Sequence, residues 1–297
     1  MVPENNLICL VELMINFIKL MVSFYNTVLL FNLIMIMKFS KRLIIFIFLL
    51  FNTACVDMLV DEQIDNNWNS KQSGNIIVLY NPLWDSPYSS KKEIIDTILI
   101  NQNYYYNCIQ DSIHRKFRNI VAVYLYSSGD GKTKIGTSDG GYASPDCFTY
   151  HYSVSFTKSD LLKLGRKDYV GAHELTHVIT FNCLGVPGSR LFSEGYAVWL
   201  NNTYAGKYLF DWIKFWGLSR ILTLQQLIDG TAEDKIYYPN CGTFIKFLVS
   251  KYGIEKANSL FTINNKDLTE AFKKTLGKDA VQLQEEYNNY CVLNFNQ

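Results

Sequence analysis

The chain has 297 residues and a formal net charge of +1, with 48% hydrophobic and 15% aromatic residues. This length allows one large domain or two lobes with a substantial core, and the aromatic content is not that of a disordered chain. The charge balance gives no electrostatic footprint for nucleic acid, and no finger-type spacing of Cys and His is present. We therefore expect a folded protein that does not bind nucleic acid.

The first 36 residues are strongly apolar. Leu20–Met37 contains no charged residue and is almost long enough to span a membrane. Two interpretations remain open for residues 1–36: an upstream extension of the reading frame, or a membrane anchor.

Residues 37–55 have the organisation of a signal peptide. The basic segment Lys38–Arg42 precedes the apolar run Leu43–Phe51, and small residues follow before Cys55. A Cys directly after Ala54 resembles the lipobox of bacterial lipoproteins, whose Cys is lipidated, although Asn52 stands where Leu is usual. The resemblance implies an extracytoplasmic, membrane-anchored lipoprotein with Cys55 as the lipidated residue.

The next elements include three predicted strands. Residues 56–74 are polar and acidic, which is typical of a tether, so we expect the folded domain to span residues 75–297. Strands are predicted at Asn75–Tyr80, Asn119–Tyr126 and Phe148–Phe156, and one long or broken helix is predicted at Lys91–Phe117. The glycine-rich stretch Ser127–Gly141 is expected to form turns.

Phe148–Phe156 alternates apolar with polar or small residues, which is typical of a half-buried strand. We expect it at the sheet edge bordering a cleft, where it could hold an extended peptide by strand addition. An ordinary edge strand is the alternative.

The segment Asp168–Asn182 contains His173-Glu174-Leu-Thr-His177, an H-E-x-x-H sequence on an expected helix. Residues four apart lie above one another on a helix, so both imidazoles project from one face and can hold one Zn²⁺. Glu174, one position along, can then act as general base toward a metal-bound water. The alternative is two buried helix histidines beside an exposed Glu.

The remainder of the chain is predicted to be helical. Ser189 is a plausible N-cap for a helix at Arg190–Asn201. Further helices are expected at Tyr208–Leu218, Leu222–Ile228, Tyr238–Tyr252, Ile254–Phe261, Leu268–Leu276 and Ala280–Leu293. The fold class is therefore α+β, with a mixed-sheet lobe at about residues 75–184 that carries the motif helix, and a mainly helical lobe at about 185–297.

A catalytic zinc site needs three protein ligands and an open position. No His follows His177, and the first acidic residue after it is Glu194, on the next expected helix. A carboxylate there is the remaining standard third ligand. The alternative is a solvated residue that interacts with the helix dipole.

The pair His173-Glu-Leu-Thr-His177 and Ser193-Glu194-Gly195-Tyr-Ala197 resembles the gluzincins, most closely the peptidase MA-like group related to aminopeptidase N. The resemblance implies a zincin-like fold and one Zn²⁺ held by His173, His177 and Glu194. It also implies that Glu174 is the base and proton shuttle.

A second segment, Tyr238-Pro-Asn-Cys-Gly-Thr-Phe244 through Tyr252-Gly253, is similar to the stretch that follows the E-G-x-A helix in this group. In related enzymes a Tyr hydroxyl stabilises the oxyanion of the tetrahedral intermediate. Tyr238 is the candidate for this role, with Tyr237 as its rival. An ordinary core or surface Tyr is the alternative in a chain with 20 tyrosines.

One departure from the family concerns specificity. No G-x-M-E-N strand, whose Glu binds the substrate's free amine, precedes His173, so an endopeptidase is favoured over an aminopeptidase. In zinc sites the ring N–H groups of the ligand histidines usually donate to acceptors that orient them. Asp146, Asp168 and Asp211 are all candidates for these acceptors, and the sequence spacing does not choose among them.

The sequence thus predicts a zinc metallopeptidase that cleaves peptide or protein substrates and contacts the membrane through its N-terminal lipid or apolar segment. The alternative is a catalytically silent surface lipoprotein that binds peptide or glycan with a peptidase-like fold. A membrane-embedded protease is disfavoured, because the motif helix lacks the apolar length to span a bilayer.

Overall fold

The structure is a computed structural model that describes residues 68–85, 91–136, 140–144, 148–154, 168–204 and 207–295. The predicted anchor, signal peptide and Cys55, and most of the expected tether, lie outside these residues. Within them, no helix combines the length and the apolar character needed to cross a bilayer.

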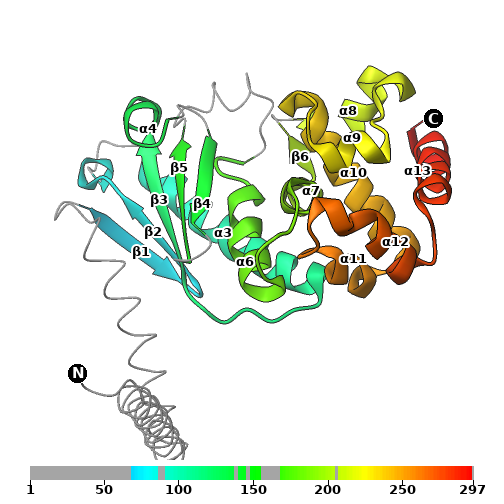
Figure 1. Cartoon of the computed structure of the whole chain (residues 1–297). Coiled ribbons are helices and arrows are strands. Elements are labelled where there is room, and N and C mark those ends of the chain that lie inside the picture. Colours follow the sequence, from blue (N-terminus) through cyan, green and yellow to red (C-terminus); the bar gives the residue numbers. More distant parts are fainter. Residues whose placement is uncertain are drawn as a thin grey trace, which may run out of the picture. The chain divides into compact units, whose positions relative to one another are not determined.

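A mixed five-stranded sheet forms the first part of the fold, in the order β1-β2-β3-β5-β4 (Figure 1). The three inner strands run parallel to one another, and each outer strand is antiparallel to its neighbour. The strands are β1 (Asn69–Ser73), β2 (Ile76–Tyr80), β3 (Val121–Ser127), β4 (Gly140–Ser144) and β5 (Thr149–Val154).

The two outer strands differ from the sequence-based expectation. β1 lies in the expected tether: Asn69–Ser73 is a run of polar residues, and it forms a strand because its backbone pairs with the buried strand β2. β4 lies partly in the expected turns, and it pairs with β5 on the side away from β3. The expectation of an edge strand at Phe148–Phe156 is therefore wrong: β5 is an inner strand, and β4 is the edge.

β5 is buried on both faces rather than half-buried. On one face, Tyr150 donates a hydrogen bond to Gln102. On the other, His151 is stacked between Tyr124 and Tyr142, with ring centroids 4.7 Å and 4.8 Å away. Aromatic rings on both neighbouring strands thus cover His151 of β5.

Two helices cover one face of the sheet: α3 (Lys91–Ile113) packs on β1 and β2, and α6 (His173–Leu184) packs on β4 and β5 (Figure 1). A short helix, α4 (Ser128–Lys134), replaces the turns expected after β3, since the Ser127 hydroxyl caps it by accepting from the Asp130 N–H. The α+β class predicted from the sequence is confirmed.

The second part of the fold is mainly helical. Its first helix is followed by a small hairpin of two strands with two residues each, β6 (Thr203–Tyr204) and β7 (Lys207–Tyr208). The helices are α7 (Arg190–Asn201), α8 (Leu209–Trp216), α9 (Leu224–Asp229), α10 (Asp234–Tyr252), α11 (Ile254–Leu260), α12 (Leu268–Leu276) and α13 (Ala280–Phe295). Single turns of 3₁₀ helix occur at Pro82–Asp85, Leu218–Arg220 and Asn265–Asp267.

The helix α10 begins one turn earlier than predicted, at Asp234 instead of Tyr238. The prediction placed Pro239 in the first turn, where a missing N–H costs nothing. In the structure Pro239 lies inside the helix, and α10 still forms because its face is buried against α7. As a consequence, Asp234 and Tyr238 lie one helical turn apart on the same side of α10.

Candidate metal centre

The motif helix α6 is held in place at its first residue by two side chains from other elements. The buried Gln102 of α3 donates to the Gly171 carbonyl, and the Asn201 amide oxygen of α7 accepts from the Ala172 N–H at 2.7 Å. Both contacts fix the backbone just ahead of His173. The orientation of the motif therefore depends on the sheet side and the helical side of the fold together.

The next helix, α7, starts at Arg190 as predicted, and the Ser189 hydroxyl accepts from the Phe192 N–H as its N-cap. Gly195 lets α7 approach α10 closely, because a Cβ at this position would lie 3.1 Å from the Cys241 carbonyl oxygen. This packing leaves Glu194 facing α6.

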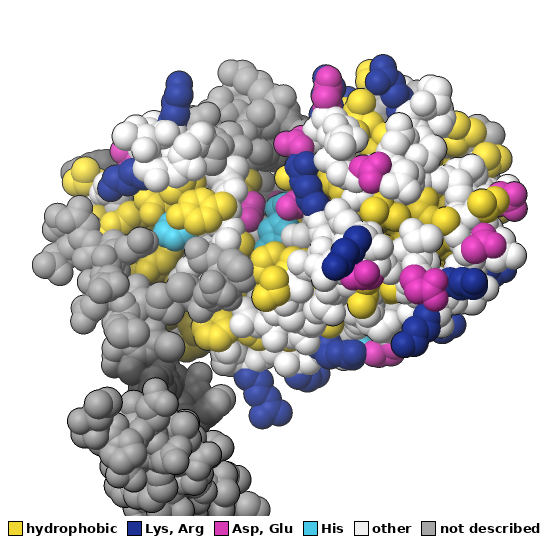
Figure 2. All heavy atoms as spheres, in the orientation of Figure 1, with side chains coloured by type: hydrophobic (Ala, Val, Ile, Leu, Met, Phe, Trp, Pro, Cys, Tyr) yellow, Lys and Arg dark blue, Asp and Glu magenta, His cyan; other side chains and the backbone are white. Residues whose placement is uncertain are grey.

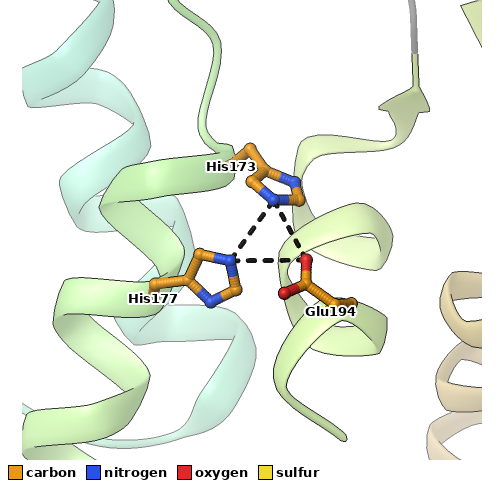
Figure 3. Close-up of side chains that lie close together, drawn as sticks. All are labelled: His173, His177 and Glu194. Carbon is orange, nitrogen blue, oxygen red and sulfur yellow. Dashed lines mark hydrogen bonds and ion pairs between the residues drawn. The ribbon is translucent and has the colours of Figure 1, made fainter. Parts of the chain in front are cut away.

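His173, His177 and Glu194 converge on one point (Figure 3). The two Nε2 atoms lie 3.3 Å apart, and the Glu194 Oε2 atom lies 3.3 Å from that of His173 and 3.6 Å from that of His177. Four ligands held tetrahedrally at the usual zinc–nitrogen and zinc–oxygen distances lie about 3.3–3.4 Å from one another. The triangle therefore matches one face of a zinc coordination tetrahedron.

The Glu194 Oε2 atom also suits a cation ligand, since it is buried and accepts no well-formed hydrogen bond. A buried carboxylate oxygen without a donor is costly unless a positive charge satisfies it. The donor set of two imidazoles and one carboxylate is also one that Zn²⁺ takes in catalytic sites. The residues present thus fit the metal that the sequence implies.

The electrostatics of the cluster favour an ionised carboxylate. Burial opposes ionisation of Glu194, but the two histidines outweigh burial and hold its pKa well below the usual range. Burial likewise lowers the pKa of His173, but Glu194 and Glu174 outweigh it and raise the pKa above its ordinary value. The site therefore presents the anionic ligand that a cation requires.

Ser193 contacts His177, and the sequence did not predict this contact. Its hydroxyl lies 3.5 Å from Nδ1 of His177, the nitrogen that points away from the cluster. Of the aspartates left open for such a role, Asp168 lies in the wall of the adjoining cavity and Asp211 is exposed on α8. Asp146 lies outside the described residues. The only sequence signal for Ser193 is its position beside Glu194.

The other two histidines take no part in the cluster. His151 is buried under tyrosine rings, which lowers its pKa to about 4, and His114 is exposed beside Glu255.

A cavity of about 420 Å³ opens beside the cluster, within the usual size of a small-ligand site. Figure 2 shows histidine atoms (cyan) reaching the surface in a hollow, with acidic side chains (magenta) next to them. The cavity is lined by His173, Glu174, Asp168, Asp234, five tyrosines (Tyr105, Tyr152, Tyr204, Tyr208, Tyr238), and backbone-rich segments that include Gly140, Gly141 and Asn201–Thr203.

The two rival tyrosines occupy different surroundings. Tyr237 is fully buried, and its hydroxyl donates to the Leu227 carbonyl at 2.9 Å. Tyr238 lines the cavity, with its ring centroid 6.1 Å from that of His173. Only Tyr238 of the two therefore faces the cluster.

The edge strand β4 approaches the motif helix through Gly141. A Cβ at this position would lie 2.3 Å from the His151 carbonyl oxygen and 3.1 Å from Cγ of Glu174. No side chain fits there, because real Cβ atoms do not approach a backbone oxygen so closely.

Gly141→Ala is therefore expected to lower the free energy of unfolding by about 1–3 kcal/mol, since β4 must move away from β5 and Glu174. Denaturant unfolding of the full chain measures the loss. Gly129→Ala is the matched control: its Cβ would meet no atom within 4 Å, and alanine is the better helix former in α4. Equal stability of the two variants would contradict the close approach of β4.

A scan against protein-family models finds no match to this sequence, and no curated protein matches it significantly. The case for a function therefore rests on the site.

Proposed function

We propose that the chain is a zinc-dependent peptidase with a zincin-like arrangement, in which His173, His177 and Glu194 hold one Zn²⁺. The single observation that carries the proposal is the triangle of two Nε2 atoms and one carboxylate oxygen with edges of 3.3, 3.3 and 3.6 Å. The alternative for Glu194, a solvated residue that interacts with the helix dipole, does not account for its position within 3.3 Å and 3.6 Å of two imidazoles.

When bound, the zinc ion supplies Lewis acidity, which polarises a carbonyl oxygen and lowers the pKa of a water molecule to about 7. The protein's own groups move the proton. Glu174 lies in the cavity wall beside His173 but outside the ligand triangle, so its carboxylate is free to accept a proton from the attacking water. It then returns the proton to the leaving amine.

Tyr238 is the proposed hydrogen-bond donor to the oxyanion of the tetrahedral intermediate. Burial and the charge of Glu194 raise the pKa of Tyr238, Arg190 lowers it, and the balance is a pKa of about 12. The phenol therefore keeps its proton at neutral pH and can donate a hydrogen bond to a negative oxygen.

The peptide substrate is proposed to lie along β4. Among the described strands β4 pairs only with β5, so its other side can add an extended peptide as a further strand. Because Gly140 and Gly141 border the same cavity as Glu174, such a peptide would pass the cluster. The expectation of an endopeptidase, and of an extracytoplasmic lipoprotein anchored through Cys55, belongs to the same proposal.

Metal analysis of the purified full chain tests the proposal together with a peptide-cleavage assay. We expect about one zinc per chain, as three protein ligands and an open position imply, loss of cleavage on chelation, and recovery on adding zinc. Cleavage that survives complete removal of metal would refute it. Bound peptide without cleavage in the zinc-loaded protein would instead favour the silent binding lipoprotein.

A further inference from the structure

Arg190 joins α7, which carries Glu194, to α10, which carries Tyr238. It is the first residue of α7, one turn before Glu194, and Asp234 is the first residue of α10, one turn before Tyr238. Residues four apart lie on the same face of a helix, so the two pairs oppose each other across the α7–α10 contact. The Arg190 guanidinium bridges them by an ion pair of 2.5 Å with Asp234.

The same guanidinium lies over both tyrosines of α10. Its central carbon is 4.9 Å from the ring centroid of Tyr237 and 5.3 Å from that of Tyr238. The Tyr237 hydroxyl is already bonded to the Leu227 carbonyl, so that ring serves as a fixed platform. Tyr238 is the neighbour whose hydroxyl Arg190 can influence.

The Tyr238 ring has a second contact, with another tyrosine ring. Tyr204, in the hairpin that follows α7, stacks on it with a centroid distance of 5.1 Å and an interplanar angle of 18°. The ring therefore has little freedom to turn. What remains to be set is the direction of its O–H bond.

A guanidinium has five N–H donors and no acceptor. A phenol oxygen that meets Arg190 must therefore accept, which leaves its own proton for an acceptor elsewhere, and Tyr238 lines the same cavity as His173. Accepting from a cation also strengthens the phenol as a donor, because linked hydrogen bonds polarise one another.

We infer that Arg190 is a positioning residue, which holds Tyr238 so that its O–H points at the His173–His177–Glu194 centre. The inference rests on the proposed function, in which Tyr238 donates to the oxyanion. A simple clamp between α7 and α10 is the competing explanation, and the two differ in whether the effect of Arg190 passes through the Tyr238 hydroxyl.

A double-mutant cycle of Arg190 and Tyr238 separates the positioning role from the clamp. Tyr238→Phe is expected to lower kcat about 100-fold, as loss of one oxyanion donor does. Arg190→Met should lower kcat about 10-fold with KM changed less than twofold, and Arg190→Lys should restore part of it, since the positioned donor acts in the transition state. In the Tyr238→Phe background, Arg190→Met should have no further effect.

Asp234→Asn is the matched control for the clamp, because it removes the ion pair and leaves Arg190 beside Tyr238. We expect it to lower kcat less than Arg190→Met does. Additive effects in the cycle, or equal effects of Asp234→Asn and Arg190→Met, would overturn the inference.

A readout without catalysis uses the metal-free full chain with ¹³C at the tyrosine Cζ atoms. Arg190→Met should shift the resonance assigned to Tyr238 by its loss in Tyr238→Phe, whereas Arg220→Met, at an exposed arginine, should not. An unmoved Tyr238 resonance would overturn the inference even if the chain is a peptidase. Conversely, a wild-type chain without zinc-dependent cleavage refutes the proposed function, and the resonance still decides the placement of Arg190.

Discussion

Glu174→Gln is expected to lower the rate of peptide cleavage by about 10²–10⁴-fold, the usual contribution of a general base, while the protein still binds about one zinc per chain. The reason is that the proposed base and the proposed metal ligands are different residues. Glu174 lines the cavity next to His173, but the three proposed ligand atoms belong to His173, His177 and Glu194. The amide of Gln keeps the shape of the carboxylate and cannot accept the proton.

The measurement pairs kcat/KM with metal content on the same preparation. Glu270→Gln, at an exposed position on α12, is the control for loss of a carboxylate elsewhere in the chain. If Glu174→Gln cleaved peptide at the wild-type rate, another group would have to be the base. If it lost zinc as well, Glu174 would belong to the ligand set rather than to proton transfer.

Local signals in the sequence were sufficient for the two helices of the site. Residues spaced by four placed His173 and His177 on one face, and Ser189 marked the start of α7 correctly, because N-capping depends on one side chain and the two or three residues after it. The proposed third ligand, Glu194, followed from being the first acidic residue after His177, with no further His in the chain, and from the resemblance to gluzincins.

The outer strands of the sheet had no comparable signal. β4 contains Gly140 and Gly141, and glycine is a poor strand former, so its strand conformation depends on pairing with β5. β1 is polar and pairs with β2 only because the chain turns back at Gly74. Pairing between strands is tertiary structure, and it decided which strand forms the edge beside the cavity.

The groups around the ligands were also beyond sequence reasoning. The contact of Ser193 with His177 and that of Arg190 with Tyr238 both depend on how α7 is rotated against its neighbours. That rotation is fixed by packing at Gly195 and at Gly242, where a Cβ would lie 2.7 Å from a methyl carbon of Val198. Both glycines lie in segments that resemble the gluzincins, but the resemblance does not say how closely α7 and α10 approach each other.

The second large effect is expected for the third ligand: Glu194→Gln should weaken zinc binding by at least 100-fold. Loss of an outer partner of a ligand costs about 10–100-fold in affinity, so loss of a charged ligand must cost more. The substitution keeps the volume of the side chain, whose oxygen Oε2 lies 3.3 Å and 3.6 Å from the two Nε2 atoms. Competition with a chelator of known zinc affinity measures the change.

Ser193→Ala is the variant with which the loss of zinc affinity in Glu194→Gln is compared. The Ser193 hydroxyl is 3.5 Å from Nδ1 of His177 and does not reach the ligand triangle, so its removal should weaken zinc binding by no more than about 10–100-fold. The expected order of affinity is wild type, then Ser193→Ala, then Glu194→Gln. The reverse order would move the third ligand away from Glu194, and Asp168 in the cavity wall would be the next carboxylate to test.

The charge of the proposed site is the reason to expect that Gln will not replace Glu194. Two neutral imidazoles and one carboxylate reduce the charge of a bound Zn²⁺ to +1, whereas two imidazoles and an amide leave it at +2 in a largely buried position. Burying an unpaired charge is costly, and Glu194 is the only acid among the three proposed ligands. The low pKa of Glu194 has the same origin, since the histidines stabilise its negative charge against the cost of burial. Zinc affinity in Glu194→Gln should therefore fall even where the fold, checked by unfolding of the metal-free chain, is unchanged.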